Sequence, residues 1–195
     1  MKGRGEMLRP DYPIMTARLR LRPYTMDDLD ALYAILSRPD VMRYLYGEPS
    51  SRAEVASTLA RRAQHPALER EGDTLFLAIE RREVDGVIGS VNLRWLSAEH
   101  QQGEIGFVLH PDYFGRGYAR EAATVALRLG FEQLGLHRII GRCDARNTAS
   151  ARLMERLGMR REAYFHHNEI FKGAWGDEFV YAMLASEWQA GAGQS

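Results

Sequence analysis

The chain of 195 residues has no net charge, no second cysteine and no long hydrophobic run. Its 26 acidic and 26 basic side chains cancel, so no overall field draws the protein to nucleic acid or to a membrane surface. A lone Cys143 cannot form an internal disulfide, and within an apolar segment it is expected to be a small buried side chain. No apolar run reaches the length of a transmembrane helix, and the N-terminus lacks the core of a secretory signal. These absences predict a cytoplasmic protein whose partners are small molecules or peptides.

The length suits one domain with its own hydrophobic core, and no repeat or low-complexity segment divides the chain. We therefore expect residues 1–195 to form a single domain. Residues 1–13 and 186–195 show no periodicity, so both ends are predicted to be loose. No metal is expected, and the sequence leaves open whether the protein is a monomer or a homodimer.

Hydrophobic periodicity predicts a succession of strands and helices. Strands are expected at residues 14–24, 74–80, 87–96, 104–109, 137–144, 160–171 and 179–184. Helices are expected to begin after Thr25, after Ser51, near Arg120 and after Asn147. The dipeptide Asp85-Gly86 is typical of a hairpin turn between antiparallel strands. The helix that begins near Arg120 allows the strands before and after it to lie parallel.

The most informative stretch covers residues 104–134, which reads as strand, glycine turn and helix. The turn consists of Phe114-Gly115-Arg116-Gly117-Tyr118-Ala119, and we refer to residues 114–119 as the phosphate turn. Its two glycines allow the backbone to approach a ligand closely, while the helix that follows offers unpaired N–H groups and a positive dipole end. Arg116 and Arg120 add positive charge. The stretch therefore predicts a site for a phosphate-like anion.

Two other phosphate-binding motifs can be compared with this sequence. A Walker loop requires Gly-Lys-Ser or Gly-Lys-Thr, and no lysine of the chain is followed by serine or threonine. A dinucleotide fingerprint requires a third glycine at the position that Arg120 occupies. Both motifs are excluded, and an ordinary glycine turn between strand and helix remains the alternative.

The phosphate turn resembles motif A of the GNAT acetyltransferase superfamily, in which Gly-x-Gly or Gly-x-Ala holds the pyrophosphate of acetyl-CoA. The form Phe-Gly-Arg-Gly-Tyr-Ala-Arg-Glu-Ala is similar to the branch of Rim-type ribosomal-protein N-terminal alanine acetyltransferases, where an aromatic residue such as Phe114 is common. A second stretch, Asn147-Thr148-Ala149-Ser150, precedes a helix ending in Leu-Gly-Met and resembles motif B of the same superfamily. Two motifs at the expected separation are more specific than one.

The resemblance implies a mixed α/β sheet in which antiparallel strands 1–4 splay from a parallel strand 5, with helices on both faces. It also implies acetyl-CoA as co-substrate. The implied acetyl-CoA contacts, with the first two acting through their backbone, are Phe107, Leu109, Phe114, Gly115, Arg116, Gly117, Tyr118, Ala119, Arg120, Asn147 and Ser150.

Transfer of an acetyl group to an amine requires a base for the amine and a proton for the departing thiolate. Glu104 enters an otherwise apolar strand just before the phosphate turn, which suits a general base. The alternative is a structural ion pair with an arginine at the strand's end. Many superfamily members carry a tyrosine in motif B as the general acid, but Met154 stands there and has no proton to give. Ser150, a water molecule or no acid at all takes that role.

The acceptor is the least determined part of the site. In the resembling superfamily, Tyr44 and Tyr46 would line the acceptor pocket, although aromatic side chains more often cover core. Trp175 lies in a connection that the resembling branch uses near the acceptor, although packing on a hydrophobic patch is the commoner role. Acidic side chains that could line a pocket for a cationic acceptor are Glu99, Glu104, Glu169, Asp177 and Glu178.

The sequence thus predicts an N-acetyltransferase that moves an acetyl group from acetyl-CoA to a primary amine by direct attack. The amine could belong to a protein N-terminus or to a small molecule. A catalytically silent acyl-CoA-binding module is the alternative, and Met154 is the observation that favours it.

Overall fold

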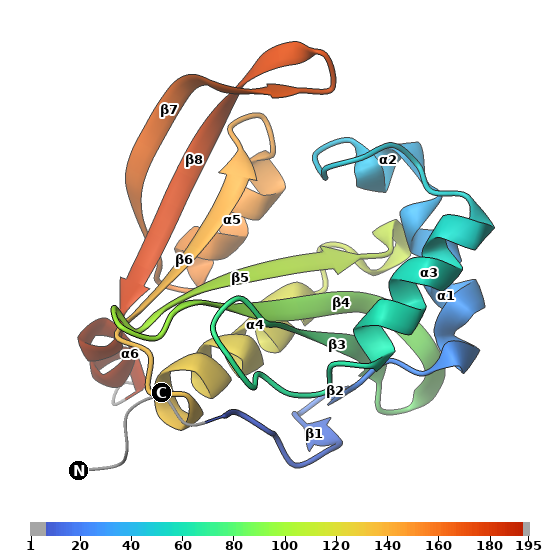
Figure 1. Cartoon of the computed structure of the whole chain (residues 1–195), viewed down its shortest axis with the longest axis horizontal. Helices are drawn as coiled ribbons and strands as arrows, with labels where there is room; N and C mark the ends of the chain where they lie inside the picture. Colours follow the sequence, from blue (N-terminus) through green and yellow to red (C-terminus); the bar gives the residue numbers. More distant parts are fainter. Residues whose placement is uncertain (1–6, 193–195) are drawn as a thin grey trace.

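The computed structural model describes residues 7–192 and contains one mixed sheet with helices packed on it (Figure 1). The strands lie in the order β1-β2-β3-β4-β5-β6-β8-β7. Their bounds are β1 Ile14–Met15, β2 Leu19–Arg22, β3 Thr74–Arg81, β4 Val84–Ser97, β5 Gln102–Leu109, β6 Arg138–Asp144, β7 Arg160–Phe171 and β8 Ala174–Leu184. The helices are α1 Leu29–Leu36, α2 Pro39–Met42, α3 Arg52–Ala63, α4 Tyr118–Arg128, α5 Thr148–Arg156 and α6 Ala185–Ala192. Within residues 7–192, no helix is long and apolar enough to cross a membrane.

The pairing of β5 with β6 positions the site. All other neighbouring strands are antiparallel, whereas β5 and β6 are parallel and pair at three positions only, from Gln102 opposite Arg138 to Glu104 opposite Ile140. Beyond these pairs the two strands diverge as they run to Leu109 and Asp144 (Figure 1). The predicted mixed sheet with a splay before the parallel strand is confirmed.

Side chains of the sheet alternate between its two faces, as a pleated strand requires. On β4, Val91 and Trp95 belong to the core that is closed by α4. The opposite face carries Ala78 of β3, which packs with Leu32 of α1 and Leu59 of α3. Helices therefore cover both faces, in agreement with the expectation from the sequence.

The hairpin between β3 and β4 differs from its prediction. The chain reverses at Arg82 and Glu83, between the end of β3 and the start of β4. Gly86 lies inside β4 with φ +112°, where the pairing with β3 shifts register around Glu80. The prediction of a hairpin turn at Asp85-Gly86 is therefore wrong. Gly86 lies in a β-bulge, which favours glycine for the same backbone freedom that a turn needs.

The expectation of loose ends is wrong for the described part of each terminus. Near the N-terminus, Leu8 is buried and exchanges two backbone hydrogen bonds with Leu68, at 2.8 and 2.9 Å. Near the C-terminus, residues 185–192 form α6, and Trp188 stacks on Phe131 with ring centroids 5.9 Å apart. Leu8 and Trp188 contact residues that are distant in sequence, so no local sequence pattern predicts these contacts. The remaining parts of the predicted loose ends, residues 1–6 and 193–195, lie outside the described residues.

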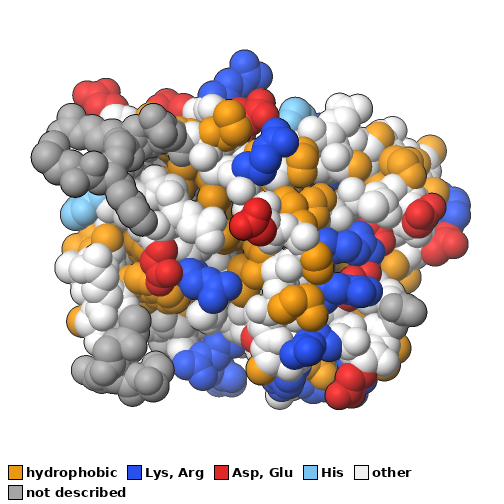
Figure 2. Space-filling model, turned by 90° about the horizontal axis from the view of Figure 1, so that it is seen from below, with side chains coloured by type: hydrophobic (Ala, Val, Ile, Leu, Met, Phe, Trp, Pro, Cys, Tyr) orange, Lys and Arg blue, Asp and Glu red, His pale blue; other side chains and the backbone are white. Residues whose placement is uncertain are grey.

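Surface charge agrees with the neutral composition. On the face shown in Figure 2, acidic and basic side chains are interspersed, and hydrophobic side chains lie between them. No single sign dominates that face.

Candidate active site

The phosphate turn has the backbone conformation that the two glycines suggested. Gly115 and Gly117 adopt φ +73° and +80°, in the left-handed region that favours glycine. Gly117 is the N-cap of α4, so the helix begins at Tyr118, two residues before the expected Arg120. Within the described chain, no acceptor receives the N–H groups of Gly117, Tyr118 or Ala119. Free donors at the positive end of a helix dipole form an anion site.

The surroundings of the turn fit a bulky phosphorylated ligand. No atom lies within 4 Å of the position that a Cβ at Gly115 would take, so the turn is open to the outside. Phe114 is 59% exposed, and Arg116 and Arg120 are exposed cations beside the turn. These residues and the free N–H groups could bind a pyrophosphate, and the acetyl-CoA contacts of residues 114–120 stay a prediction.

The side chains of Glu104 and Phe107, both on β5, lie on opposite faces of the sheet. Phe107 pairs with Val91, whose side chain points to the α4 face, and Phe107 packs against the same core. Glu104 pairs with Arg94, on the alternate set of positions, so its side chain points to the face of α1 and α3. Leu109, the last residue of β5, is buried. The strand thus separates the α4 side from the side on which Glu104 lies.

Motif B forms the start of α5 and contacts β6. The Asn147 side chain caps the helix, because its Oδ1 accepts a hydrogen bond from Ser150 N–H at 3.1 Å. Met154 is buried against β6, where a Cβ at Gly141 would lie 2.6 Å from its sulfur. Met154 is therefore a core side chain. Burial raises the pKa of the Cys143 thiol to about 11, so Cys143 stays protonated and is no nucleophile.

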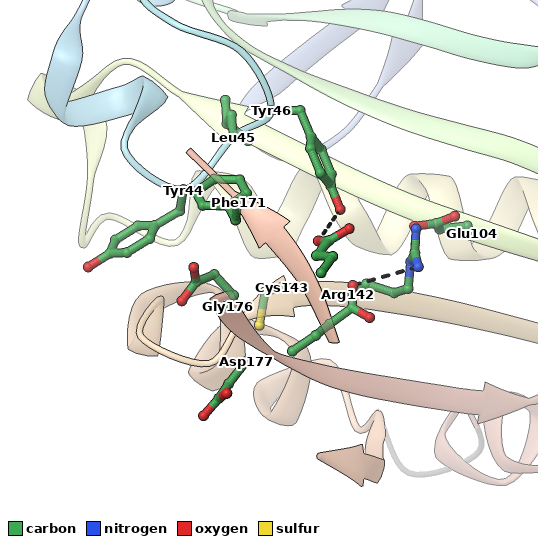
Figure 3. Close-up of a pocket in the computed structure, with 12 residues that line it drawn as sticks. Tyr44, Leu45, Tyr46, Glu104, Arg142, Cys143, Phe171, Gly176 and Asp177 are labelled. Carbon is green, nitrogen blue, oxygen red and sulfur yellow. Dashed lines mark hydrogen bonds and ion pairs between the residues drawn. The ribbon is translucent and has the colours of Figure 1, made fainter. Parts of the chain in front are cut away.

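A pocket lies between the end of β6, the β7–β8 hairpin and the loop after α2 (Figure 3). We call it the acceptor pocket, after the role that we propose for it. Its lining residues are Tyr44, Leu45, Tyr46, Glu104, Arg142, Cys143, Asp144, Glu169, Phe171, Gly176, Asp177 and Glu178. Five of these carry carboxylates and one carries a guanidinium, so the pocket is strongly acidic. Of the acidic side chains singled out from the sequence, Glu99 alone lies outside this lining.

Arg142 contacts two of these carboxylates, Glu104 and Glu178. Its Nε lies 3.3 Å from Glu104 Oε1, and its Nη1 lies 3.6 Å from Glu178 Oε1. Glu178 is 6% exposed, and burial raises its pKa even though the positive charge of Arg142 opposes that change. Glu104 thus faces the pocket and also forms the ion pair that was its structural alternative.

The two tyrosines expected at the acceptor both line the pocket (Figure 3). Tyr46 donates its hydroxyl hydrogen to Glu169 at 2.5 Å, which joins the loop after α2 to β7. Burial and this hydrogen bond raise the pKa of Tyr46 to about 12. Trp175 is 60% exposed and is not part of the lining, although the next two residues, Gly176 and Asp177, are.

Sequence reasoning did not single out Arg142 or Asp144. Both lie near the end of β6, whose first residues are mostly apolar, and a charge that interrupts an apolar strand is the same signal that drew attention to Glu104. Within residues 7–192, no group of histidine, cysteine or acidic side chains is arranged to hold a metal ion.

An anion-binding turn at a helix N-terminus lies beside two diverging parallel strands and near an acidic pocket, an arrangement suited to binding an anionic ligand at the carboxyl ends of the strands. Comparison with known proteins is more specific. The family profile described as the acetyltransferase (GNAT) domain matches residues 18–160. The chain belongs to the GNAT acetyltransferase family.

Similar proteins that align with most of this chain are N-acetyltransferases as well. An uncharacterised N-acetyltransferase of Bacillus subtilis is 35% identical over 180 residues, which are 90% of this chain and 98% of the relative. A spermidine N(1)-acetyltransferase of Escherichia coli is 28% identical over 173 residues, which are 88% of this chain and 89% of the relative. Among solved structures, a GNAT acetyltransferase of Bacillus anthracis superposes with a TM-score of 0.80 at 32% identity, covering 89% of this chain and 98% of the other. The protein is an acetyl-CoA-dependent N-acetyltransferase.

Proposed function

We propose that the acceptor is a small polycationic amine and that its primary amino group attacks the acetyl-CoA thioester directly. The observation that carries this proposal is the acceptor pocket, whose lining includes five carboxylates and one arginine. Such a cluster attracts a ligand with several positive charges and disfavours an anionic one. The similarity to a spermidine acetyltransferase supports the same class of acceptor.

The chain offers a group for each step that the amine requires. Acetyl-CoA, bound at the phosphate turn, supplies a carbonyl carbon that is open to attack and a thiolate leaving group. Glu104 takes a proton from the ammonium group, directly or through water, so that the free amine can attack. Backbone N–H groups of Phe107 and Leu109 stabilise the negative charge that develops on the carbonyl oxygen. As the carbon–sulfur bond breaks, the nitrogen loses its second proton, and the departing thiolate gains one through Ser150 or water, which is reprotonated by the proton from nitrogen; Met154 has no proton to give.

Arg142 has two roles in this proposal. Without an acceptor it balances part of the negative charge of Glu104 and Glu178, which lie on either side of it. When a cationic amine enters, the ammonium group competes with the guanidinium for these carboxylates. Glu178 is the more buried of the two acids, so the more exposed Glu104 is the one that we assign to the amine.

The Rim-type resemblance suggests a different acceptor, the N-terminal amine of a protein. It depends on the phosphate turn, which contacts the donor and does not select the acceptor. Thiol release should therefore be measured with spermidine, with a monoamine of similar length and with peptides that begin in alanine or serine.

We expect kcat/KM to be highest for the polyamine and lower by roughly 10-fold for each cation removed, since one tenfold step corresponds to about 1.4 kcal/mol of interaction. Glu169→Gln should weaken this preference for charge. Glu99→Gln, outside the pocket, is the matched control and should leave it unchanged. Preferential acetylation of the peptides would overturn the polyamine assignment, and binding of coenzyme A without turnover of any amine would support the silent-module alternative.

A further inference from the structure

The segment before β2 binds the first turn of α4, next to the phosphate turn. The Glu121 carboxylate accepts hydrogen bonds from the Thr16 hydroxyl at 2.6 Å and from Arg18 N–H at 2.9 Å. Its second oxygen accepts a hydrogen bond from Arg18 Nε at 2.7 Å and lies 2.7 Å from Arg18 Nη2. Burial alone would raise the pKa of Glu121, but these donors hold it below its usual value. The carboxylate therefore stays ionised and ties the start of β2 to α4.

The turn that presents Arg18 is fixed by its own hydrogen bonds. Thr16 N–H donates to the Leu19 carbonyl at 3.0 Å, and Leu19 N–H donates to the Thr16 hydroxyl oxygen at 2.9 Å. Leu19 is fully buried and anchors the turn in the core. A guanidinium presents its donors in a rigid plane. Because Nε and Nη2 of Arg18 are held by Glu121, the direction of its remaining nitrogen, Nη1, is fixed as well.

Through that nitrogen, Arg18 reaches the phosphate turn. Nη1 donates to the carbonyl oxygen of Arg116 at 2.9 Å. This carbonyl shares a trans peptide plane with Gly117 N–H, and in such a plane the two groups point in opposite directions. Arg18 also lies over the Tyr118 ring, 4.9 Å from its centroid, and its Nη2 would lie 3.3 Å from a Cβ at Gly117. Arg18 therefore borders three consecutive residues of the turn and sets the direction of Gly117 N–H.

We propose that Arg18 and Glu121 are positioning residues for the donor, which hold the phosphate turn so that Gly117 N–H is presented to the pyrophosphate of acetyl-CoA. This inference rests on the proposed role of the turn. Because Glu121 neutralises Arg18, the pair acts through geometry and adds no net charge to the site. A tie that served only the fold would lower stability and would affect every donor alike, whereas positioning affects donors that carry a pyrophosphate.

The test compares two donors in Arg18→Gln and in the parent. With acetyl-CoA, KM should rise about 10- to 100-fold, as expected when a charge-assisted hydrogen bond is lost. With S-acetylpantetheine, which has the same thioester and no pyrophosphate, kcat/KM should stay within about twofold of the parent, because the turn has no phosphate to hold. Titration with coenzyme A, well below the melting temperature, should show the same loss of affinity. Unchanged coenzyme A affinity, or an equal loss with both donors, would overturn the proposal.

Four further variants keep the result interpretable. Arg82→Gln is the matched control, because Arg82 Nη1 donates to the carbonyls of Thr16 and Ala17 on the same turn, at 3.3 and 3.5 Å. It should leave coenzyme A affinity unchanged. Glu121→Gln should reproduce the effect of Arg18→Gln, and the double variant should be little worse than either, because both changes break one unit. If Gly117→Val binds coenzyme A as tightly as the parent, the phosphate turn does not bind the donor. If Gly117→Val loses binding but Arg18→Gln binds normally, only the positioning role of Arg18 and Glu121 is rejected.

Discussion

Replacing Glu104 with glutamine keeps the shape of the side chain and removes its ability to accept a proton. If Glu104 is the base, kcat should fall by about 10²- to 10⁴-fold, while coenzyme A affinity hardly changes. Among residues 7–192, the ion-pair partner that the change affects is Arg142, whose Nε lies 3.3 Å from Glu104 Oε1. An ion pair of this partly exposed kind contributes about 1 kcal/mol or less. A 100-fold loss corresponds to about 2.7 kcal/mol, so it exceeds what the broken pair explains.

The assay is thiol release with saturating acetyl-CoA and the preferred amine, measured across pH. The parent rate should fall toward acidic pH as the base and the amine take up protons. At high pH the amine loses its proton unaided, so Glu104→Gln should recover part of its deficit. Arg142→Gln is the control: it breaks the same ion pair but keeps the carboxylate, and its loss should be at most about 10-fold.

Two results would refute this reasoning. A variant with nearly parental kcat at every pH would exclude Glu104 as the base. A deficit that stays constant as pH rises, matched by Arg142→Gln and accompanied by lower stability, would show that the pair matters for structure. If Glu178→Gln instead shows the large, pH-dependent loss, the base is Glu178, whose raised pKa would suit it for that role.

Other predictions concern the donor site, the acceptor pocket and acid stability. Gly117→Val should abolish coenzyme A binding, since φ +80° is strained for a β-branched side chain; titration checks binding, and a melting curve shows whether the fold survives. Tyr46→Phe, which removes the hydrogen bond to Glu169, should raise the KM of the amine by roughly 3- to 10-fold and leave that of acetyl-CoA alone; equal changes in both would remove Tyr46 from the pocket's function. The hydrogen bond from Arg138 lowers the pKa of Glu162 from 4.5 to about 2. Because the folded pKa is the lower one, this stabilisation is present above pH 4.5 and is lost as pH falls toward 2. Glu162→Gln should therefore flatten the melting temperature between pH 4.5 and pH 2, and a parental slope would contradict the assignment.

The parts of the site that are local in sequence were predictable. The conformation of Gly115 and Gly117 follows from a glycine turn before a helix, because both the φ angles and the free N–H groups are set within a few residues. Resemblance to a family added the splay of β5 from β6, which periodicity alone does not show.

The acceptor pocket was predictable only as a set of acidic residues and two tyrosines, without their arrangement in space. Glu104, Arg142 and Glu178 come from three different strands, and their distances depend on the order β5-β6-β8 in the sheet. The sequence separates these strands by helices and a hairpin, so no spacing rule brings Arg142 between the two carboxylates. The same reason explains why Leu8 and Trp188, whose partners are distant, were assigned to loose ends.

The divergence of β5 and β6 after three residue pairs has a kinetic consequence. The phosphate turn leads into α4 on one face of the sheet, and Glu104 points to the other face. Donor and acceptor can therefore arrive from opposite sides and occupy the protein together, and neither has to leave before the other enters. In the proposed reaction the acetyl group is transferred directly through the opening between the two strands, and no side chain forms a covalent intermediate with it. Double-reciprocal plots of rate against one substrate, at several fixed concentrations of the other, should then intersect and should not run parallel.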